Sequence, residues 1–174
     1  MSASQPRGHA RRQLVTMLLV GEGHAEEALL RHLRGLYIAR GSGVTAAIRN
    51  ARGKGAAHVV DYAMGQTRNA AYDRMLVLLD TDTDWTDAVR KKAAQARIDV
   101  IACEPCLEAL LLRAHGAPLR DGLASRQLKQ QFAARFGCAA DEPQVYEAHF
   151  GRERLEQARQ RLPEMDRLLR ALLP

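Results

Sequence analysis

The chain has 174 residues, 47% of them hydrophobic, and its 26 Lys and Arg residues against 20 Asp and Glu give a formal net charge of +6. This length and composition predict one domain with a sizeable core, and the positive charge favours anionic partners. Three cysteines are too few for the disulfide framework of a small secreted protein, and no apolar stretch approaches the roughly 18 residues of a membrane span. We therefore expect a cytoplasmic protein without a membrane partner.

Strands and helices are predicted to alternate through the first two thirds of the chain, after a flexible basic arm at residues 1–12. Apolar runs that predict strands cover residues 14–20, 44–48, 74–80 and 97–103. The segments that follow these strands predict helices over residues 24–37, 56–67, 85–96 and 105–115. This alternation is typical of an α/β fold with a parallel four-stranded sheet and helices on both faces.

The last third of the chain has a helical pattern only. One helix is expected over residues 124–137, with Ser125 as its amino-terminal cap and Gly137 at its end. Residues 149–172 predict one or two further helices, with Pro163 as the break between them. We found no internal repeat and no low-complexity segment that would indicate a repeat protein or a linker.

Acidic residues follow three of the four predicted strands. They are Glu22 after the first strand, Asp80, Asp82 and Asp84 after the third, and Glu104 and Glu108 after the fourth. Functional groups of parallel α/β sheets gather beyond the carboxyl ends of the strands, so we expect these carboxylates to converge. Grouped carboxylates repel one another unless protons or a cation neutralise them, and hard oxygen ligands suit Mg²⁺ or Mn²⁺.

Each of these acids also has a purely structural interpretation. The D-x-D motif after the third strand can be a turn that caps the next helix through Thr83 or Asp84. Glu26 lies in the first turn of a predicted helix, where the helix dipole favours acidic residues, and Glu108 can be a solvated helix residue. The convergence of three strand ends is what favours a functional site over these separate explanations.

Basic residues are concentrated between residues 31 and 74, where eight Lys or Arg stand against two acids. The densest part is "IRNARGKG" at residues 48–55, which follows the second predicted strand and contains Arg49, Arg52 and Lys54. One interpretation is a phosphate-facing patch, and the other is a solvated loop.

The motif C-x-x-C at Cys103 and Cys106 leaves two interpretations open. A zinc site would need further ligands, and the sequence has no second pair of this kind. The motif is either a redox pair or two small apolar residues on either side of Pro105.

The acidic motifs resemble those of a TOPRIM domain, the metal-binding α/β module of topoisomerases, primases, and OLD- and RecR-type proteins. The TOPRIM pattern has a glutamate in the turn after the first strand, which matches Glu22 in "VGEGHAEEALL". It also has a D-x-D motif after a later strand, which matches Asp80 and Asp82 in "LVLLDTDTD". The resemblance implies four parallel strands between helices.

Within this group the chain resembles the RloB-like family, which is associated with restriction and abortive-infection loci. Its three motifs are similar to "EGHAE" at residues 22–26, "DTD" at 80–82 and "CEPCLEALLLRAH" at 103–115. Ala25 stands where a threonine is usual and Ala109 where an aromatic residue is usual, and Glu104 replaces a small polar residue, but no expected carboxylate is lost.

The resemblance implies two parts of one domain and a reaction on nucleic acid. Residues 13–116 would form the TOPRIM-like α/β domain, and residues 117–174 a helical extension packed on the same domain. The implied activity is Mg²⁺- or Mn²⁺-dependent phosphoryl transfer on DNA or RNA. Phosphodiester hydrolysis in a phage-defence or DNA-maintenance setting is the leading form, because none of the four tyrosines has the context of a covalent nucleophile.

The resemblance also implies roles for individual residues. Asp80 and Asp82 would hold the metal ion, and Glu22 would act as general acid or base or as a further ligand. Glu26 and Glu108 would complete the metal-binding set or support it. The cations expected to hold the nucleic-acid backbone are Arg49, Arg52 and Lys54.

Two other functions are compatible with the same residues. The first is a non-catalytic nucleic-acid-binding module that acts with a partner protein. The second is an enzyme acting on small nucleotides, which a cavity too narrow for a polynucleotide would favour. The sequence leaves open whether the protein works with a partner ATPase and whether it forms a homodimer.

Overall fold

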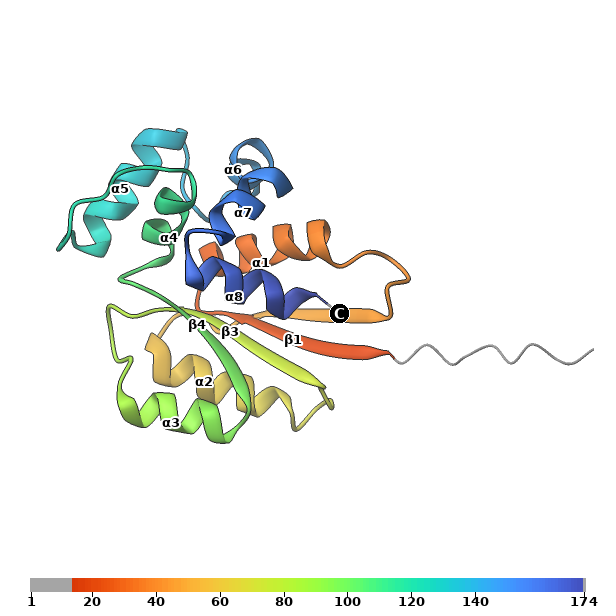
Figure 1. The fold of residues 1–174 in the computed structure, drawn as a ribbon. Coiled ribbons are helices and arrows are strands. Elements are labelled where there is room, and N and C mark those ends of the chain that lie inside the picture. The colour runs from red at the N-terminus through yellow and green to blue at the C-terminus, as the bar shows by residue number, and fades with distance from the viewer. Residues whose placement is uncertain (1–13, 174) are drawn as a thin grey trace, which may run out of the picture.

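The computed structural model describes residues 14–173, so the basic arm expected at residues 1–12 lies outside the described part of the chain. Four parallel strands form one sheet in the order β2-β1-β3-β4 within these residues (Figure 1). The strands are β1 (Val15–Gly21), β2 (Val44–Asn50), β3 (Arg74–Asp80) and β4 (Ile98–Cys103). This architecture confirms the predicted α/β fold with a parallel four-stranded sheet.

Eight helices in residues 14–173 cover both faces of the sheet. They are α1 (His24–Tyr37), α2 (Gly55–Gln66), α3 (Asp87–Gln95), α4 (Leu107–Ala114), α5 (Ser125–Phe136), α6 (Pro143–His149), α7 (Arg152–Arg159) and α8 (Pro163–Leu172). Figure 1 shows α2 and α3 on one face of the sheet, and α1 and α8 on the other, with the remaining helices on the side of α1.

The two central strands contribute side chains to both faces, which explains why their sequences are continuously apolar. In β1, Leu19 belongs to the core under α1, whereas Leu18 and Val20 belong to the core under α2 and α3. In β3, Leu78 belongs to the core under α1, and Val77 belongs to the core under α2 and α3. Each face therefore has its own hydrophobic core, as is usual for a parallel sheet between helices.

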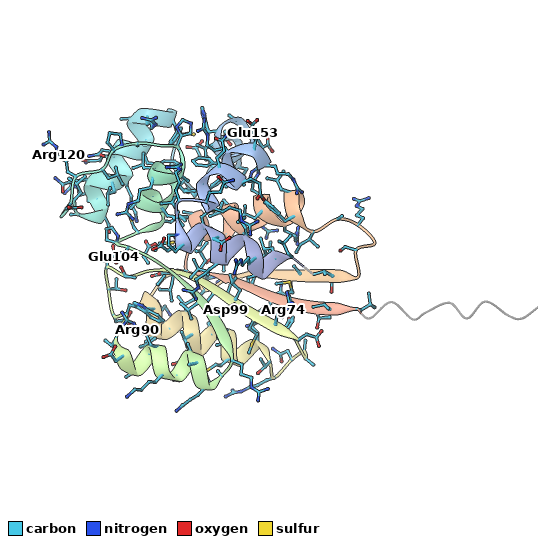
Figure 2. All side chains as sticks on the ribbon, viewed as in Figure 1. Arg74, Arg90, Asp99, Glu104, Arg120 and Glu153 are labelled. Carbon is cyan, nitrogen blue, oxygen red and sulfur yellow. The ribbon has the colours of Figure 1, made fainter. Side chains whose placement is uncertain are left out.

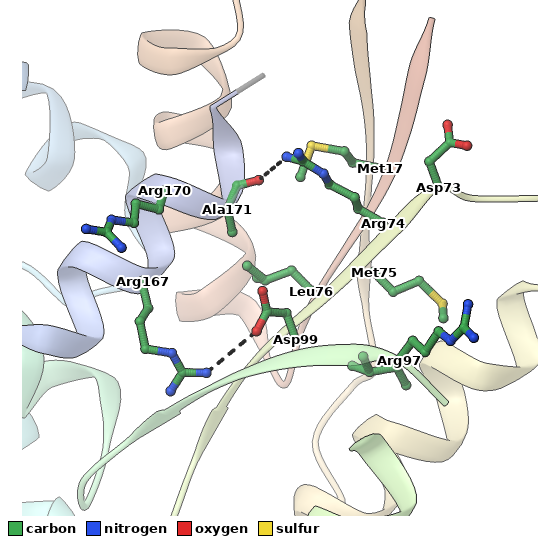
Figure 3. A pocket seen from close by; sticks show the side chains of 11 residues that line it. Met17, Asp73, Arg74, Met75, Leu76, Arg97, Asp99, Arg167, Arg170 and Ala171 are labelled. Carbon is green, nitrogen blue, oxygen red and sulfur yellow. Dashed lines mark hydrogen bonds and ion pairs between the residues drawn. The ribbon is translucent and has the colours of Figure 1, made fainter. Parts of the chain in front are cut away.

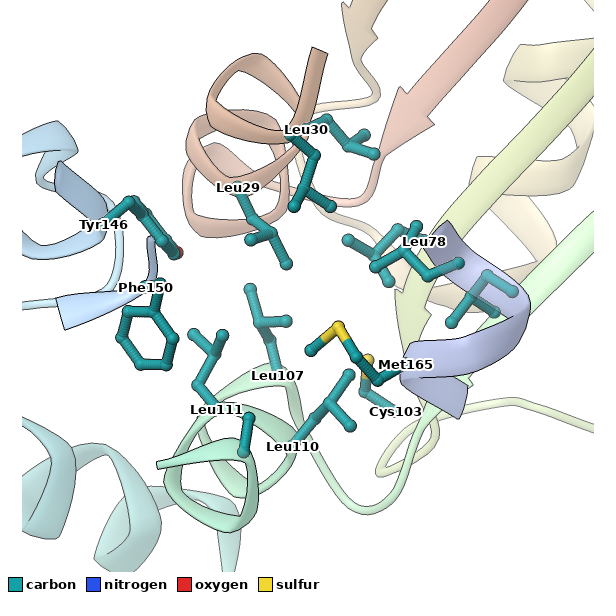
Figure 4. Packing of buried hydrophobic residues seen from close by; sticks show 14 of the residues in the cluster. Leu29, Leu30, Leu78, Cys103, Leu107, Leu110, Leu111, Tyr146, Phe150 and Met165 are labelled. Carbon is teal, nitrogen blue, oxygen red and sulfur yellow. The ribbon is translucent and has the colours of Figure 1, made fainter. Parts of the chain in front are cut away.

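The helices after residue 116 share the larger core with the α/β part. Figure 4 shows side chains from both parts of the chain in this core, among them Leu29, Leu107, Leu111, Phe150 and Met165. All five are at most 1% exposed. This common core fixes α5–α8 against α1 and α4, and it places α5 beside the carboxyl ends of the strands.

Two helix starts differ from the sequence-based expectation, and one helix was not expected. Ser125 is the first residue of α5 and not its cap, and its side chain turns instead to another loop. The amino-terminal cap of α3 is Thr86, whose side chain accepts a hydrogen bond from the Val89 N–H, rather than Thr83 or Asp84. Helix α6, with Pro143 in its first turn, was not predicted because seven residues give too short a helical pattern.

The connection order creates a crevice between β1 and β3. The chain passes from β1 to β2 on one side and then returns to β3 on the other side of β1, so the strand order reverses at this point. Ligands of open α/β sheets bind at such a switch point, beyond the carboxyl ends of the strands. Glu22 and Asp80 lie at the carboxyl ends of the two strands that flank this crevice.

Candidate functional site

Four of the five predicted metal-binding residues line one cavity of about 400 Å³ at the carboxyl edge of the sheet. They are Glu22 after β1, Glu26 in α1, Asp80 at the end of β3 and Glu108 in α4. We call this space the acidic cavity. Because these four carboxylates come from four elements, it is the parallel arrangement of the strands that brings them together.

Backbone N–H groups hold three of these carboxylates in place. Glu22 Oε2 accepts a hydrogen bond from the Asp80 N–H at 2.9 Å, which ties the end of β1 to the end of β3. Asp80 Oδ1 accepts one from the Leu107 N–H at 2.8 Å, at the start of α4. Glu26 Oε2 accepts one from the Gly23 N–H at 2.8 Å, at the amino terminus of α1. The carboxylates are therefore fixed before any ligand binds.

Glu108 differs from the other three because one of its oxygens is unpaired. The residue is 6% exposed, and Glu108 Oε2 is the one buried side-chain nitrogen or oxygen of the described chain without a hydrogen-bond partner. A buried carboxyl oxygen without a partner is costly and requires an explanation. It indicates that a proton donor, a water molecule or a cation occupies the acidic cavity in the working protein.

Burial and mutual repulsion make the carboxylates of this cavity weak acids. Burial, followed by the charges of Glu26, Glu108 and Glu22, raises the pKa of Asp80 to about 8. Burial also raises the pKa of Glu26 to about 7, and it raises the pKa of Glu22 although the hydrogen bond from Asp80 opposes this. Near neutral pH the group therefore retains protons unless a cation replaces them.

Two charged residues of the acidic cavity were missed by the sequence analysis. Lys129 on α5 and Asp141 in the connection after α5 form part of its wall. Burial alone would lower the pKa of Lys129, but the charges of Glu108 and Asp80 outweigh it and raise that pKa. The helical extension thus contributes a positive group that faces the acids, and only the tertiary packing of α5 reveals it.

Asp82 and Asp84 do not join the four carboxylates. Asp82 is exposed, does not line the acidic cavity, and accepts a hydrogen bond from the Ser125 hydroxyl at the start of α5. Asp84 accepts hydrogen bonds from the Ala56 and Ala57 N–H groups at the start of α2. In this structure Asp82 therefore holds the start of α5, and Asp84 holds the start of α2.

Glu104, the remaining acid after β4, is exposed at the carboxyl edge of the sheet (Figure 2). It does not line the acidic cavity. Its neighbours in the C-x-x-C motif, Cys103 and Cys106, are both free and buried, and burial raises the pKa of both thiols. Buried thiols with raised pKa values are poor nucleophiles, so the packing explanation of this motif is favoured over the redox pair.

All three predicted phosphate-binding residues line a second, open depression of about 1110 Å³. We call it the basic groove, and it contains Arg49, Arg52 and Lys54 together with His58 and Tyr62. The basic groove and the acidic cavity have three residues in common: Gly23, His24 and Gly53. An anionic chain lying in the groove would therefore pass the mouth of the acidic cavity.

The backbone of the basic loop is strained. Arg52 and Lys54 have φ angles of 62° and 75°, in the left-handed region that favours glycine, and Gly53 between them has φ 77°. Such a conformation costs about 1–2 kcal/mol for a residue with a Cβ atom. The Gly53 N–H donates a hydrogen bond to the Glu22 carbonyl oxygen at 2.7 Å, which fixes the loop beside the acidic cavity. The strain indicates that the two basic side chains serve a purpose that glycine would not.

In the part of the chain that the structure describes, no group of three or more His, Cys, Asp or Glu side chains has the geometry of a metal site. Three of the predicted ligands have one oxygen bonded to a backbone N–H, and Asp82 faces Ser125. The chemistry of the donors nevertheless suits a hard cation, because four carboxylates of the proposed set line the cavity and an oxygen of one of them is buried and unpaired.

Comparison of the chain with family models, with curated proteins and with solved structures found no match. Among the described residues, none of the helices combines the length and the apolar character needed to cross a membrane.

Proposed function

We propose that the protein is a Mg²⁺- or Mn²⁺-dependent nuclease of the TOPRIM type, similar to RloB-like proteins, that hydrolyses phosphodiester bonds in DNA or RNA. The observation that carries the proposal is the acidic cavity itself, with the buried, unpaired oxygen of Glu108 among three other carboxylates. Four carboxylates in a partly closed cavity are stable together only when protons or a cation reduce their charge.

The position of the basic groove supports nucleic acid as the substrate. Arg49, Arg52 and Lys54 lie in an open groove that adjoins the acidic cavity, so phosphates on either side of a reacting one have cations to contact. Phosphate contacts of this kind position a nucleic acid without reading its sequence. The cavity alone, at about 400 Å³, has room for a single phosphate and its sugar rather than for a duplex.

The residues that would hold the ion are Asp80 and Glu108, because each lines the acidic cavity and offers carboxylate oxygen. A bound Mg²⁺ or Mn²⁺ would supply Lewis-acid stabilisation of the charge that develops on the reacting phosphate. Lys129 faces the same carboxylates from α5 and is placed to neutralise a phosphate that enters the cavity.

Glu22 is the residue we assign to proton transfer. Burial raises its pKa from the ordinary value of 4.5, which moves it toward the range where a carboxyl group can both accept and donate a proton. No tyrosine of residues 14–173 lines the acidic cavity, which favours water over a covalent tyrosine nucleophile. Asp82 enters this proposal as the residue that positions α5 through Ser125.

A cleavage assay tests the proposal. Single-stranded and duplex DNA and RNA are incubated with the protein and Mg²⁺ or Mn²⁺, and products are separated on denaturing gels. We expect metal-dependent cleavage that is lost in Asp80→Asn and in Glu108→Gln but kept in Glu104→Gln, since Glu104 is exposed outside the cavity. Cleavage that continues unchanged in Asp80→Asn would exclude this site.

The second candidate is a nucleic-acid-binding module that acts with a partner protein and does not turn over substrate. Two observations favour it. Glu22, Glu26 and Asp80 each accept a hydrogen bond from a backbone N–H group. In addition, no group of side chains among the described residues has the geometry of a metal site. This alternative predicts binding that weakens steeply with salt and no cleavage with either metal ion.

A further inference from the structure

The basic groove runs around the end of β2, and its two sides differ. Asn50 faces α1, because its side-chain amide donates a hydrogen bond to Glu27 Oε2 at 2.9 Å. Successive residues of a strand point to opposite faces, so Arg49 points to the face that α2 covers. Ala47, two residues before Arg49 and on the same face, packs against the core under α2 and α3. Arg49 and α2 therefore form one side of the groove, which we call the α2 side.

Two aromatic rings follow a cation along the α2 side of the groove. His58 and Tyr62 both line the groove and are four residues apart, so they lie on the same face of α2. Lys54 directly precedes the helix, four residues before His58. Four residues of a helix span about 6 Å along its axis. Because Gly53 lines the acidic cavity and the two rings do not, this row leads away from the acidic cavity.

The two rings are adjacent and partly exposed. Their centroids are 6.3 Å apart, and their planes are tilted by 43°. A hydrogen bond of 3.1 Å from His58 Nε2 to the Ala51 carbonyl oxygen holds the imidazole. Tyr62 is half-buried and packs against the core under α2 and α3. Both rings are thus held in place and present a surface in the groove on which another planar group can stack.

The positive charge on this side of the groove has no acidic partner. Asp61, the one acid of α2, forms an ion pair with Lys92 on α3 and does not line the groove. The three cations of the groove, Arg49, Arg52 and Lys54, form no ion pair with any acid in residues 14–173. The α2 side therefore offers aromatic surface and uncompensated positive charge together.

The arginines at the opposite, amino edge of the sheet are used differently. Figure 3 shows Arg167 on α8 in an ion pair with Asp99 at 3.6 Å, and Arg74 bonded to the Ala171 carbonyl oxygen. Those contacts fasten α8 to the strands. Of the three cations of the basic groove, only Arg49 uses its side chain in a hydrogen bond among the described residues, through Nη1 to the Ile48 carbonyl oxygen at 3.0 Å.

We propose that the basic groove binds single-stranded rather than double-stranded nucleic acid, with an unpaired base stacked on Tyr62 and His58. Arg49 and Lys54 contact the phosphates next to that base. This inference rests on the proposed function in taking nucleic acid as the ligand. A base stacks on a side chain only when its face is uncovered, and in a duplex the neighbouring bases cover it. Aromatic rings beside cations that follow the backbone are the usual means of binding single strands.

Fluorescence anisotropy in the presence of a chelator tests the preference without cleavage. The probes are a labelled oligothymidylate, an abasic oligonucleotide of the same length, and a duplex of that length. The abasic strand has the phosphates but no base that could stack. We expect wild type to bind the oligothymidylate at least about fivefold more tightly than the abasic strand, and more tightly than the duplex.

Substitutions of two tyrosines test the stacking residue. Tyr62→Leu removes the ring but keeps an apolar side chain on the core, and Tyr62→Phe keeps the ring. Tyr72→Leu is the matched control, because Tyr72 is half-buried on the same core but does not line the groove. We expect Tyr62→Leu to bind the oligothymidylate at least about fivefold more weakly than wild type, with an unchanged salt slope and an unchanged affinity for the abasic strand. Tyr62→Phe and Tyr72→Leu should bind all probes as wild type does.

The inference is overturned if wild type binds the duplex or the abasic strand as tightly as the oligothymidylate. It is overturned as well if Tyr62→Leu binds the oligothymidylate like wild type, or if Tyr72→Leu weakens binding as much as Tyr62→Leu. The proposed function fails by a different result, because cleavage that is absent or that continues in Asp80→Asn contradicts the nuclease while single-strand binding persists.

Discussion

Gly21 is the residue that lets the end of β1 approach α1. A Cβ atom at this position would lie 2.8 Å from Glu26 Cβ and 2.8 Å from the Glu27 backbone nitrogen. We expect Gly21→Ala to lower the free energy of unfolding by about 1–3 kcal/mol, because neither the helix backbone nor the strand can move away cheaply. Urea denaturation measures this difference.

Gly35 provides the control, because it lies in α1, the helix that Gly21 approaches, and a Cβ atom there would meet nothing within 4 Å. Gly35→Ala should stabilise the protein by up to about 1 kcal/mol, since alanine has the higher helix propensity. If both substitutions change the free energy of unfolding by the same amount, the close contact of Gly21 with α1 is not the reason that this position requires glycine.

Asp80 makes the stability of the metal-free protein depend on pH. Its pKa is about 8 in the folded protein against 3.8 ordinarily, because of burial and the neighbouring carboxylates. The folded state then binds the proton more tightly than the unfolded state. Its contribution to stability is therefore complete below the ordinary pKa and is lost as the pH rises through about 8. Asp80→Asn cannot ionise, so its stability relative to wild type should increase between about pH 5 and about pH 9.

Thermal unfolding in the presence of a chelator measures this difference. Glu104→Gln serves as the control for loss of a nearby carboxylate, because Glu104 is exposed. If the difference in unfolding temperature between Asp80→Asn and wild type stays constant over the whole pH range, Asp80 is not buried in its protonated form.

The loop between β2 and α2 combines a strained backbone with positively charged side chains, because Arg52 and Lys54 both have positive φ angles. Arg52→Gly and Lys54→Gly each remove one positive charge and relieve a left-handed backbone conformation. We expect both variants to be at least as stable as wild type in urea. We also expect each to bind single-stranded DNA or RNA more weakly, with a salt dependence reduced by about one phosphate contact.

Fluorescence anisotropy of a labelled oligonucleotide at several salt concentrations measures both the affinity and the salt slope. Lys91→Ala removes one charge from the exposed side of α3 and is the control. An unchanged salt slope in both loop variants would show that the basic groove does not contact phosphate.

The elements themselves were predictable where the sequence signal was long and continuous. The strand at residues 74–80 and the helix at residues 24–37 were predicted with the bounds that β3 and α1 have in the structure. Side chains alternate between two buried faces in β3, so all five residues between Arg74 and Asp80 are apolar and the pattern is strong. Helix α6, with seven residues, has too few turns to give such a pattern. Helix caps were less predictable because the Ser125 hydroxyl bonds to Asp82 rather than to its own helix.

At the scale of the whole molecule, the topology explains which parts of the candidate site the sequence could predict. A parallel sheet brings all carboxyl strand ends to one edge, so Glu22, Asp80 and Glu108 could be grouped without coordinates. Lys129 could not, because α5 reaches the acidic cavity only through a core that it shares with α4. The orientation of the Asp82 side chain could not be predicted either, because it depends on the hydroxyl of Ser125, which is more than 40 residues away in the sequence.

We expect carboxylates from separate elements to bind one divalent cation, and direct titration of the ion tests this expectation. Calorimetric titration of Mn²⁺ and Mg²⁺ into the chelator-treated protein should show saturable binding in wild type and in Glu104→Gln, and none in Asp80→Asn or Glu108→Gln. Proton release on binding should accompany it, because the ion replaces the protons that Asp80 and Glu26 retain near neutral pH. Absence of binding to wild type, or equal binding by all four proteins, would contradict the account.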